Sequence, residues 1–500
     1  MAKQNDRAKR ESFLQPAVPR PHHDYNPRGH TRRSFLHWAL AGISAFFANR
    51  VWPKPTTAAT ASTPRTQTAP VVYLTPADAG YKAAKETYNG TISIQPKLIA
   101  RCANEAGVQQ AVQRAIGQKL PIAVKSGGHS FEGFSLNDDG LVIDVSPMRE
   151  LKFDEKTGVL TAGAGCRIVD VNNFLLPRGR FLPSGSCDTV GLSGLTLGGG
   201  YGILSRKWGL TCDHLRAVRM IDGTGKIRDS QDDSELLWAC KGGGNGHFGV
   251  VTQMTFQTRA VPKSFIAWKF RIYKLDEKRA TDLLDEWFRA TTNLPHDAFS
   301  AWVMNGTQVT ILLTTTGNPA DLAAVRKTLG AFSNKTTTGG PVPLAKALTW
   351  YYGDPGPVLF KNASAGYYKG IDDLRSALPG VFAEVLHVPG LIFQVNTLGG
   401  AIAEGEGAYP HRAFPYLGEQ QAYWEAPSQA EKRIAAIQRV GEHITKAGIT
   451  RHYANYPDLA FKDWATAYYG MENYGRMQKL KRECDPDNRV QHPQSVRLPK

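Results

Sequence analysis

Residues 183–202 read PSGSCDTVGLSGLTLGGGYG. Glycine fills seven of the eighteen positions from Gly185 to Gly202, whereas it makes up about 7% of an average protein. Such density predicts that the backbone closely approaches something flat or another backbone, because glycine has no Cβ atom. A flexible linker is the alternative, but the interleaved Val190, Leu195 and Tyr201 argue against it.

A second glycine motif lies upstream, where residues 125–130 read KSGGHS. It follows residues 122–124, which predict a short buried strand. Consecutive glycines let backbone N–H groups converge on an anion such as a pyrophosphate, and Lys125 adds positive charge. A tight turn carrying a surface His129 is the alternative.

A third glycine motif lies downstream, where residues 236–251 read LLWACKGGGNGHFGVV. Residues 244–249 satisfy GxGxxG, but that dinucleotide-binding motif requires a strand before it and a helix after it. Here a helical pattern at 233–240 precedes the glycines and a strand pattern at 250–256 follows them. A Rossmann interpretation is therefore excluded by context.

The rest of the chain predicts two kinds of folding unit. Up to about residue 259, glycine-punctuated strands at 141–145 and 218–222 accompany a helix at 108–116. From about residue 260, strands at 301–304 and 308–313 mix with an amphipathic helix at 322–332. This second pattern favours an α+β unit with its sheet covered by helices on one face.

Together the three motifs resemble the FAD-binding domain of the vanillyl-alcohol-oxidase superfamily, and most closely its berberine-bridge-enzyme-like branch. The resemblance runs from Ile92 to Thr258 and resumes at Arg451–Val496. It implies an α+β fold in which residues 71–260 form the first part of the FAD-binding domain and 261–450 an α+β substrate domain with an antiparallel sheet. Residues 451–500 would return to the FAD-binding domain and carry the catalytic tyrosine.

The resemblance also implies how FAD is held. The histidine matching His129 bonds the flavin 8α-methyl group, and the cysteine matching Cys187 bonds flavin C6. Lys125 stands where relatives usually have Arg, and His247 where they usually have Asn, and neither change removes a backbone amide. The full expected cofactor-binding set is His129, Cys187, Lys125, Ser126, Gly127, Gly128, Ser130, Gly185, Ser186, Val190, Gly191, Gly194, Gly199, Gly200, Tyr201, Gly202, Gly249, Val250, Val251 and Asn455.

The catalytic expectation rests on residues 452–458, HYANYPD, which resemble the family's Tyr-x-Asn-Tyr segment. In many relatives the tyrosine matching Tyr456 is the catalytic base. An ordinary tyrosine, with a pKa of about 10, needs a nearby cation or donor for that role. Gln394 and Asn396, within the stretch FQVNTLGG at 393–400, are candidates to assist it.

Two departures bear on the substrate. Sugar-oxidising relatives carry a carboxylate where this chain has Asn396, which weakens a sugar assignment. His411 and Arg412 match another family segment and are expected to be structural. Val190 falls where relatives place an oxygen-gating side chain, and valine there is typical of enzymes that admit O2.

The resulting hypothesis is an oxidase that moves a hydride from a hydroxyl-bearing substrate to flavin N5 and reduces O2 to H2O2. A sugar or oligosaccharide is the first expectation for the substrate. An aromatic alcohol, polyketide or alkaloid-like metabolite is the alternative. A dehydrogenase with another acceptor, a membrane-tethered dehydrogenase and a flavin-free binding protein also stay open.

Composition excludes other classes. The net charge of +16 suggests nucleic acid, but residues 1–50 hold nine Lys or Arg against three Asp or Glu, and the remaining basic residues are dispersed. We therefore expect no nucleic-acid partner. The six cysteines have no metal-ligand spacing, so we expect no metal, and no apolar run in the main body is long enough for a stable membrane span.

The first 70 residues predict an export leader. Arg32-Arg33 precedes a short apolar stretch at 38–47, a pattern typical of a twin-arginine signal, and a Thr/Ala/Pro-rich stretch at 56–70 follows. That route moves folded proteins, which suits an enzyme loaded with flavin before export. We expect the twin-arginine export machinery as a partner and a periplasmic or extracellular location. A disordered basic tail is the alternative.

Overall fold

The computed structural model describes residues 69–351, 353, 356–363 and 366–499. The expected export leader, residues 1–70, lies outside these described residues except for its last two positions. Within the described part of the chain, no helix is long and apolar enough to cross a bilayer.

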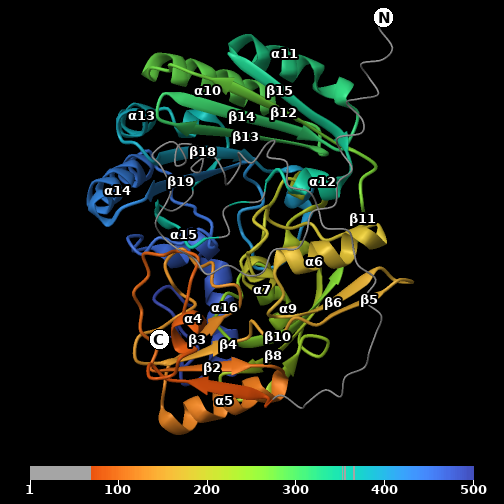
Figure 1. Cartoon of the computed structure of the whole chain (residues 1–500), viewed down its shortest axis with the longest axis vertical. Helices are drawn as coiled ribbons and strands as arrows, with labels where there is room; N and C mark the ends of the chain where they lie inside the picture. Colours follow the sequence, from red (N-terminus) through yellow and green to blue (C-terminus); the bar gives the residue numbers. More distant parts are fainter. Residues whose placement is uncertain (1–68, 352, 354–355, 364–365, 500) are drawn as a thin grey trace, which may run out of the picture.

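A four-stranded sheet in the order β1-β2-β4-β3 lies at one end of the molecule (Figure 1). Its strands are β1 (Val71–Leu74), β2 (Leu98–Cys102), β3 (Ile122–Lys125) and β4 (Leu141–Asp144). β4 pairs in parallel with β2 and β3, and α5 (Glu105–Gln118) connects β2 to β3. Asn104 caps α5 by accepting a hydrogen bond from the Gly107 amide. The predicted helix and both predicted strands are confirmed, and β3 ends where the KSGGHS loop begins.

A second, antiparallel sheet has the order β5-β6-β10-β8-β9. Its strands are β5 (Leu151–Asp154), β6 (Val159–Gly163), β8 (Leu215–Asp222), β9 (Ile227–Asp229) and β10 (Gly249–Gln257). Helix α9 (Ser234–Cys240) precedes the third glycine motif and β10 follows it. This order is the helix-then-strand order predicted from the sequence, and it confirms that the GxGxxG match is not a Rossmann motif.

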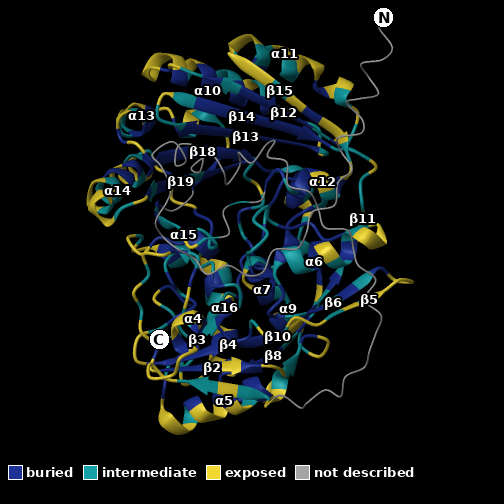
Figure 2. Cartoon of the chain, viewed as in Figure 1, coloured by how far each residue is buried: buried dark blue, intermediate teal, exposed yellow. Residues whose placement is uncertain are grey.

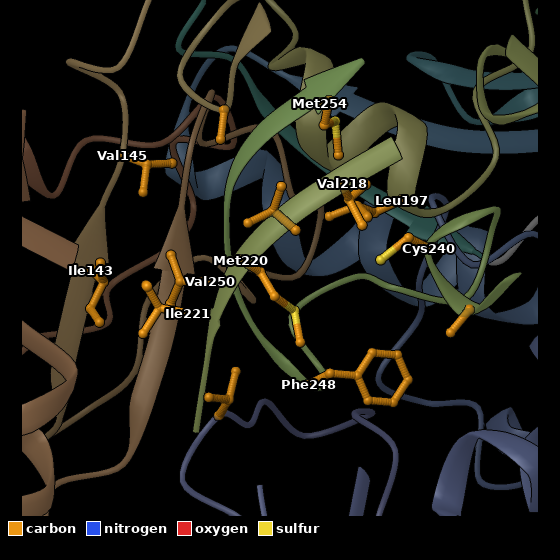
Figure 3. Close-up of a cluster of buried hydrophobic side chains, with 14 of the residues drawn as sticks. Ile143, Val145, Leu197, Val218, Met220, Ile221, Cys240, Phe248, Val250 and Met254 are labelled. Carbon is orange, nitrogen blue, oxygen red and sulfur yellow. The ribbon is translucent and has the colours of Figure 1, made fainter. Parts of the chain in front are cut away.

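One hydrophobic core joins these two sheets to the end of the chain. Figure 3 shows side chains of β4, β8 and β10 gathered with Leu197, Cys240 and Phe248. The same core includes residues of α15 (Trp464–Tyr469) and α16 (Met471–Cys484). The last fifty residues therefore pack with the first part of the chain, although residues 261–450 separate them in sequence.

A third sheet, at the other end of the molecule, has the order β15-β12-β14-β13-β18-β19-β16, with β17 paired to β19. Its strands are β12 (Phe265–Ile272), β13 (Ala298–Asn305), β14 (Gln308–Thr315), β15 (Lys335–Val342), β16 (Leu359–Ala363), β17 (Tyr367–Tyr368), β18 (Leu391–Thr397) and β19 (Tyr416–Trp424). All its pairings are antiparallel.

Four helices cover one face of this sheet in Figures 1 and 2. They are α10 (Glu277–Thr291), α11 (Ala323–Phe332), α13 (Leu378–His387) and α14 (Ala430–Lys446). Residues alternate along a strand, so Leu391, Phe393 and Val395 of β18 pack under the helices. Gln394 and Asn396 therefore face the FAD-binding part. The expected α+β fold with an antiparallel, helix-covered sheet is confirmed, whereas the domain boundaries near 260 and 450 remain predictions.

Candidate active site

The first two glycine motifs meet at Gly127 and Gly191. A Cβ atom on Gly127 would lie 2.3 Å from the Gly191 nitrogen, so neither position has room for a side chain. The hydroxyls of Ser126 and Ser193 both donate to the carbonyl of Ala164, at 2.7 and 2.8 Å, and hold the two segments together. The close backbone approach predicted from the glycine content therefore exists, and here the partner is another loop.

His129 and Cys187 lie on either side of one side chain, Thr189. The Thr189 Oγ1 is 3.0 Å from Nε2 of His129 and 3.5 Å from Sγ of Cys187. The His129 ring also stacks on Tyr88, with centroids 4.2 Å apart and planes at 17°. The structure thus brings together two residues that are 58 positions apart in sequence and that the family pattern assigns to one flavin ring.

Burial keeps both side chains uncharged. It lowers the pKa of His129 to about 4, helped by the charge of Arg167, so the imidazole is neutral at neutral pH. Burial raises the pKa of the Cys187 thiol, and the hydrogen bond with Thr189 opposes that rise. A neutral imidazole has a ring nitrogen with a free lone pair, as bond formation to carbon requires. The other five cysteines are buried free thiols, as expected for small core residues.

The other residues of the KSGGHS loop are positioned by the protein itself. Lys125 is buried, with its Cε 3.3 Å from where a Cβ of Gly128 would lie, and Gly128 has a φ of +69°, which favours glycine. The Ser130 hydroxyl accepts a hydrogen bond from the Phe134 amide at 2.9 Å. These contacts within the protein hold the loop in place.

The end of the 183–202 stretch lies against the segment 452–458, which was expected to be catalytic. The Gly200 amide donates to the Tyr453 hydroxyl at 2.8 Å, and Asn455 Nδ2 donates to the Leu195 carbonyl at 3.0 Å. Asn455 Oδ1 accepts from Asn245 Nδ2 at 2.7 Å. Asn455 therefore joins the 183–202 stretch and the third glycine motif to the segment that carries Tyr456.

The remaining expected cofactor residues have varied surroundings. Gly202 lies against the backbone of Ser184 and Gly185, the two residues that precede Ser186 in the sequence. Gly194, in α7 (Leu192–Leu197), is exposed and has open space at its Cβ position. Gly199 has a φ of +122°. Gly249, Val250 and Val251 pair with β8, and the two valine side chains lie in the core, so any cofactor contact there would involve backbone.

Three oxygen-bearing side chains converge at Tyr456. Its Oη lies 2.8 Å from Tyr201 Oη and donates to Glu419 Oε2 at 3.2 Å. Tyr201 Oη is 3.4 Å from the same carboxylate oxygen. All three side chains are half-buried, so they remain accessible to a small molecule. A hydrogen-bonded tyrosine pair on a carboxylate can accept a proton and pass it on.

Gln394 and Asn396 extend this network along β18. Gln394 Nε2 donates to Asn396 Oδ1 at 2.8 Å, and Asn396 Nδ2 donates to Tyr201 Oη at 3.2 Å. Gln394 also pairs across the sheet with Glu419 of β19. The two residues expected to assist Tyr456 are therefore connected to it through Tyr201.

The electrostatics differ from the expectation that a cation or donor would stabilise the Tyr456 phenolate. A carboxylate lies there instead. Burial, and then the charge of Glu419, raise the pKa of Tyr456 well above its ordinary value. Burial also raises the pKa of Glu419 to about 7, against the hydrogen bonds from the two tyrosines. Tyr456 is thus a neutral hydroxyl near pH 7, and Glu419 is the group that titrates there.

Glu419 is the functional residue that sequence reasoning missed. The stretch YLGEQQAYW at 416–424 forms β19 and places Glu419, Gln421 and Tyr423 on one face. A glutamate alternating with polar and aromatic residues inside an otherwise buried strand was the available signal. It carried no motif, and only the pairing of β18 with β19 relates it to Tyr456.

His411 and Arg412 have structural roles, as expected. His411 Nε2 lies 2.9 Å from the Ala467 carbonyl, and Arg412 Nη2 pairs with Asp213 Oδ1 at 2.7 Å. No cluster of three or more His, Cys, Asp or Glu side chains that could hold a metal occurs within the described part of the chain.

These features fit a flavin nucleotide. Glycine-rich backbone, at positions where a side chain would clash, lies beside the neutral His129 imidazole and the Cys187 thiol. The Tyr456 hydroxyl and the Glu419 carboxylate form a group that can accept a proton. Residues 96–231 match the family described as FAD binding domain, and residues 452–497 match the family described as berberine and berberine like. Both matches fall on the segments that carry the resemblance.

Known proteins agree with this class. YgaK, an uncharacterized FAD-linked oxidoreductase of Bacillus subtilis, is 30% identical over 437 residues, which cover 84% of this chain and 95% of that relative. A monolignol oxidoreductase of Arabidopsis thaliana is 26% identical over 455 residues, covering 80% and 84%. The structure of a carbohydrate oxidase from Microdochium nivale with a substrate analogue has a TM-score of 0.77 and 25% identity, covering 86% of this chain and 98% of that one.

The fold and the site therefore define an FAD-linked oxidoreductase with the vanillyl-alcohol-oxidase type of FAD-binding domain. Within that class, the chain belongs to the berberine-bridge-enzyme-like family.

Proposed function

We propose that this protein is an exported oxidase of sugar or oligosaccharide hydroxyl groups that uses O2 and holds FAD through two covalent bonds. The observation that carries the proposal is the contact of Tyr456 Oη with Glu419 Oε2 at 3.2 Å, on the sheet face that looks toward the glycine motifs. That contact offers a route for the proton of a substrate hydroxyl. The monolignol relative supports the runner-up, an aromatic alcohol.

Bound FAD would supply the two-electron acceptor for the substrate C–H bond and pass the electrons on to an external acceptor. His129 and Cys187 would hold its ring, and the backbone of residues 126–128 and 199–202 would accommodate the rest. Val190 supports O2 as the acceptor because a valine there leaves more space than a leucine. The hydrogen bonds at Thr189 support the double attachment because they bring both side chains to one point.

The chain's own residues would manage the proton. A substrate hydroxyl donates to Tyr456 Oη while the Tyr456 proton moves to Glu419 Oε2, so no free phenolate forms. This removes the difficulty of a tyrosine pKa above 10, because the final acceptor is a carboxylate with a pKa of about 7. Tyr201, with Oη 2.8 Å from Tyr456, would keep the Tyr456 hydroxyl in place.

The polar face of β18 and β19 supports a sugar as the substrate. Gln394, Asn396, Glu419 and Gln421 present donors and acceptors in a row, and Gln421 Nε2 donates to Glu419 Oε1 at 2.9 Å. Such a row suits several hydroxyl groups of a sugar. Asn396 stands where sugar-oxidising relatives carry a carboxylate, and Glu419 on β19 would supply a carboxylate in its place. Tyr423, which is half-buried and stacks on the buried Phe360 with centroids 5.5 Å apart, would offer its ring to a sugar or an aromatic substrate alike.

The deciding experiment is a substrate panel with a peroxide readout. Cellobiose, chitobiose and 4-hydroxycinnamyl alcohol are supplied in air to the purified yellow protein. We expect peroxide with at least one of the two sugars. The Tyr456→Phe variant should lose about 10²- to 10⁴-fold in kcat while keeping its flavin spectrum. Turnover of the alcohol alone would replace the sugar proposal with the runner-up. Turnover with a dye acceptor but without peroxide would identify a dehydrogenase.

Export is proposed from the leader alone. Changing Arg32 and Arg33 to Lys should retain the protein inside the producing cell, because twin-arginine transport depends on that pair. Fractionation of cells expressing each form measures the location. An unchanged location would contradict the proposal without affecting the enzymatic one.

A further inference from the structure

The edge strand β16 contacts the loops of the active site through three consecutive residues. Phe360 packs edge-on against Phe131, with centroids 5.0 Å apart. Asn362 Nδ2 donates to the Tyr456 carbonyl at 3.1 Å. Between them, Lys361 points to the opposite side of the strand, where its Nζ contacts Glu132 and lies 3.1 Å from Asp458 Oδ1.

The two carboxylates belong to the loop of His129 and the loop of Tyr456, which carry the proposed flavin attachment and the proposed proton transfer. Glu132 follows His129 by three positions, and Asp458 follows Tyr456 by two. One cation from the third sheet therefore ties the proposed flavin-attachment loop to the proposed catalytic loop. Between these loops the rings of Phe131 and Tyr456 stack, with centroids 5.4 Å apart and planes at 10°.

This cluster is shielded from water. The side chains of Lys361, Glu132 and Asp458 are 18%, 9% and 11% exposed. Burial raises the pKa of Glu132, although Lys361 opposes the rise. Burial acts to lower the pKa of Lys361, but the two carboxylates outweigh it and raise that pKa. Lys361 therefore stays charged, and its removal would leave buried carboxylates without their shared cation.

We propose that Lys361 is a positioning residue, which fixes the Tyr456 phenol relative to the His129 loop by pairing with Glu132 and Asp458. This inference rests on the proposed role of Tyr456. Within the described part of the chain, the ion pairs of Lys361 are with Glu132 and Asp458. Lys361 acts through the two acids and through the ring contact of Phe131 with Tyr456.

The test compares four forms of the flavin-loaded enzyme. Lys361→Met removes the cation, and Lys361→Arg keeps a charge that can reach both acids. A triple variant, Lys361→Met with Glu132→Gln and Asp458→Asn, removes all three charges. Lys278→Met, which breaks an exposed pair with Asp282, is the matched control. Each is assayed for kcat and KM with cellobiose or 4-hydroxycinnamyl alcohol, whichever the wild type oxidises, and for thermal stability.

A positioning role predicts a specific pattern. In Lys361→Met, kcat should fall by about tenfold to a hundredfold with little change in KM, because a small displacement of a reacting group is that costly. Lys361→Arg should recover most of kcat. The triple variant should regain thermal stability because no buried charge is left unpaired, yet its kcat should stay low because the tie between the loops is missing. Lys278→Met should match the wild type.

A purely structural role gives the opposite result, in which kcat returns together with stability in the triple variant. That outcome, or a normal kcat in Lys361→Met, would overturn the proposal. Hydrogen exchange of the same proteins supplies a readout that needs no substrate. Residues 129–134 and 456–460 should exchange faster in Lys361→Met and in the triple variant but not in the control. Unchanged exchange there would also overturn the proposal. A wild type that oxidises neither probe would count against the proposed function, and the exchange result would still decide the role of Lys361.

Discussion

The Thr189 hydroxyl lies 3.0 Å from Nε2 of His129, and the same oxygen is 3.5 Å from the sulfur of Cys187. When Nε2 carries the imidazole proton, the Thr189 hydroxyl accepts a hydrogen bond from Nε2–H, and the lone pair on Nδ1 stays free. The Thr189 hydroxyl can then donate a hydrogen bond to the Cys187 sulfur, and such a bond favours the thiolate over the thiol. One side chain thus prepares both proposed attachment points.

Replacing Thr189 with Val should lower the yield of covalent flavin, because the shape is kept while both hydrogen bonds are lost. Intact-chain mass spectrometry on freshly produced protein measures the fraction that carries the mass of FAD. Thr189→Ser retains the hydroxyl and should remain close to wild type. Equal yields in the Val and Ser variants would exclude this role for the hydroxyl.

Cys187→Ala should keep its flavin through His129 alone. After acid denaturation, the precipitated wild type and the Cys187→Ala variant should both stay yellow, whereas a variant that also carries His129→Ala should release its flavin. Cys166→Ala removes a buried core thiol and serves as the control. Flavin released from the denatured wild type would refute covalent attachment while leaving FAD binding intact.

Glu419→Gln should remove the acid limb of the pH–rate profile. In the wild type kcat should rise with pH through about 7, because proton acceptance requires the ionised Glu419 carboxylate. Glutamine cannot accept the proton, so kcat should fall by about 10²-fold or more and lose this dependence. Gln421→Glu is a useful comparison, since it adds a carboxylate one strand repeat away. A wild-type limb near pH 7 that persists in Glu419→Gln would assign it to another group.

Acid should destabilise the fold between about pH 6.5 and pH 4. Burial lowers the pKa of His214 and His492 to about 4 and of His411 to about 3, as it does for His129. Below pH 6.5 the unfolded chain binds protons at these sites while the folded chain does not, so stability falls as pH falls. Each such histidine contributes up to about 1.4 kcal/mol per pH unit. Denaturant unfolding at several pH values measures the slope.

His492→Gln should reduce the slope of the unfolding free energy against pH by the amount that corresponds to about one proton. The variant lacks one of the sites that take up a proton only when the chain unfolds. Its stability at pH 7 should also be lower, since the stacking on Phe134 is lost. His387→Gln changes an exposed histidine and is the comparison variant. A slope unaffected by His492→Gln would show that other groups dominate acid unfolding.

Lys481→Met should destabilise the protein by about 3–5 kcal/mol, as expected when one partner of a buried ion pair is removed. Lys481 and Asp485 are fully buried, with Nζ 2.7 Å from Oδ2, and Nζ also donates to the carbonyls of His247 and Val490 at 2.6 Å. The pair thus joins the end of the chain to the third glycine motif. Urea unfolding measures the loss, and Lys479→Met, an exposed lysine of the same helix, should cost little.

The sequence by itself determined the class of protein. The glycine motifs, His129, Cys187 and Tyr456 are local patterns whose spacing identifies the family, and the periodicity of residues 301–332 predicted strands and a helix that the structure confirms. These features need no distant partner to be recognised, because turn geometry and side-chain alternation depend on neighbours along the chain.

Only the tertiary structure decided which other side chains complete the site. Thr189 lies within the 183–202 motif, but its contact with His129 depends on two loops meeting at Gly127 and Gly191. Glu419 reaches Tyr456 only through the register of β19, and a shift of one residue would turn it toward the helices. Lys361 joins two loops that are more than 320 residues apart. Such relationships arise from long-range packing, which no local pattern encodes.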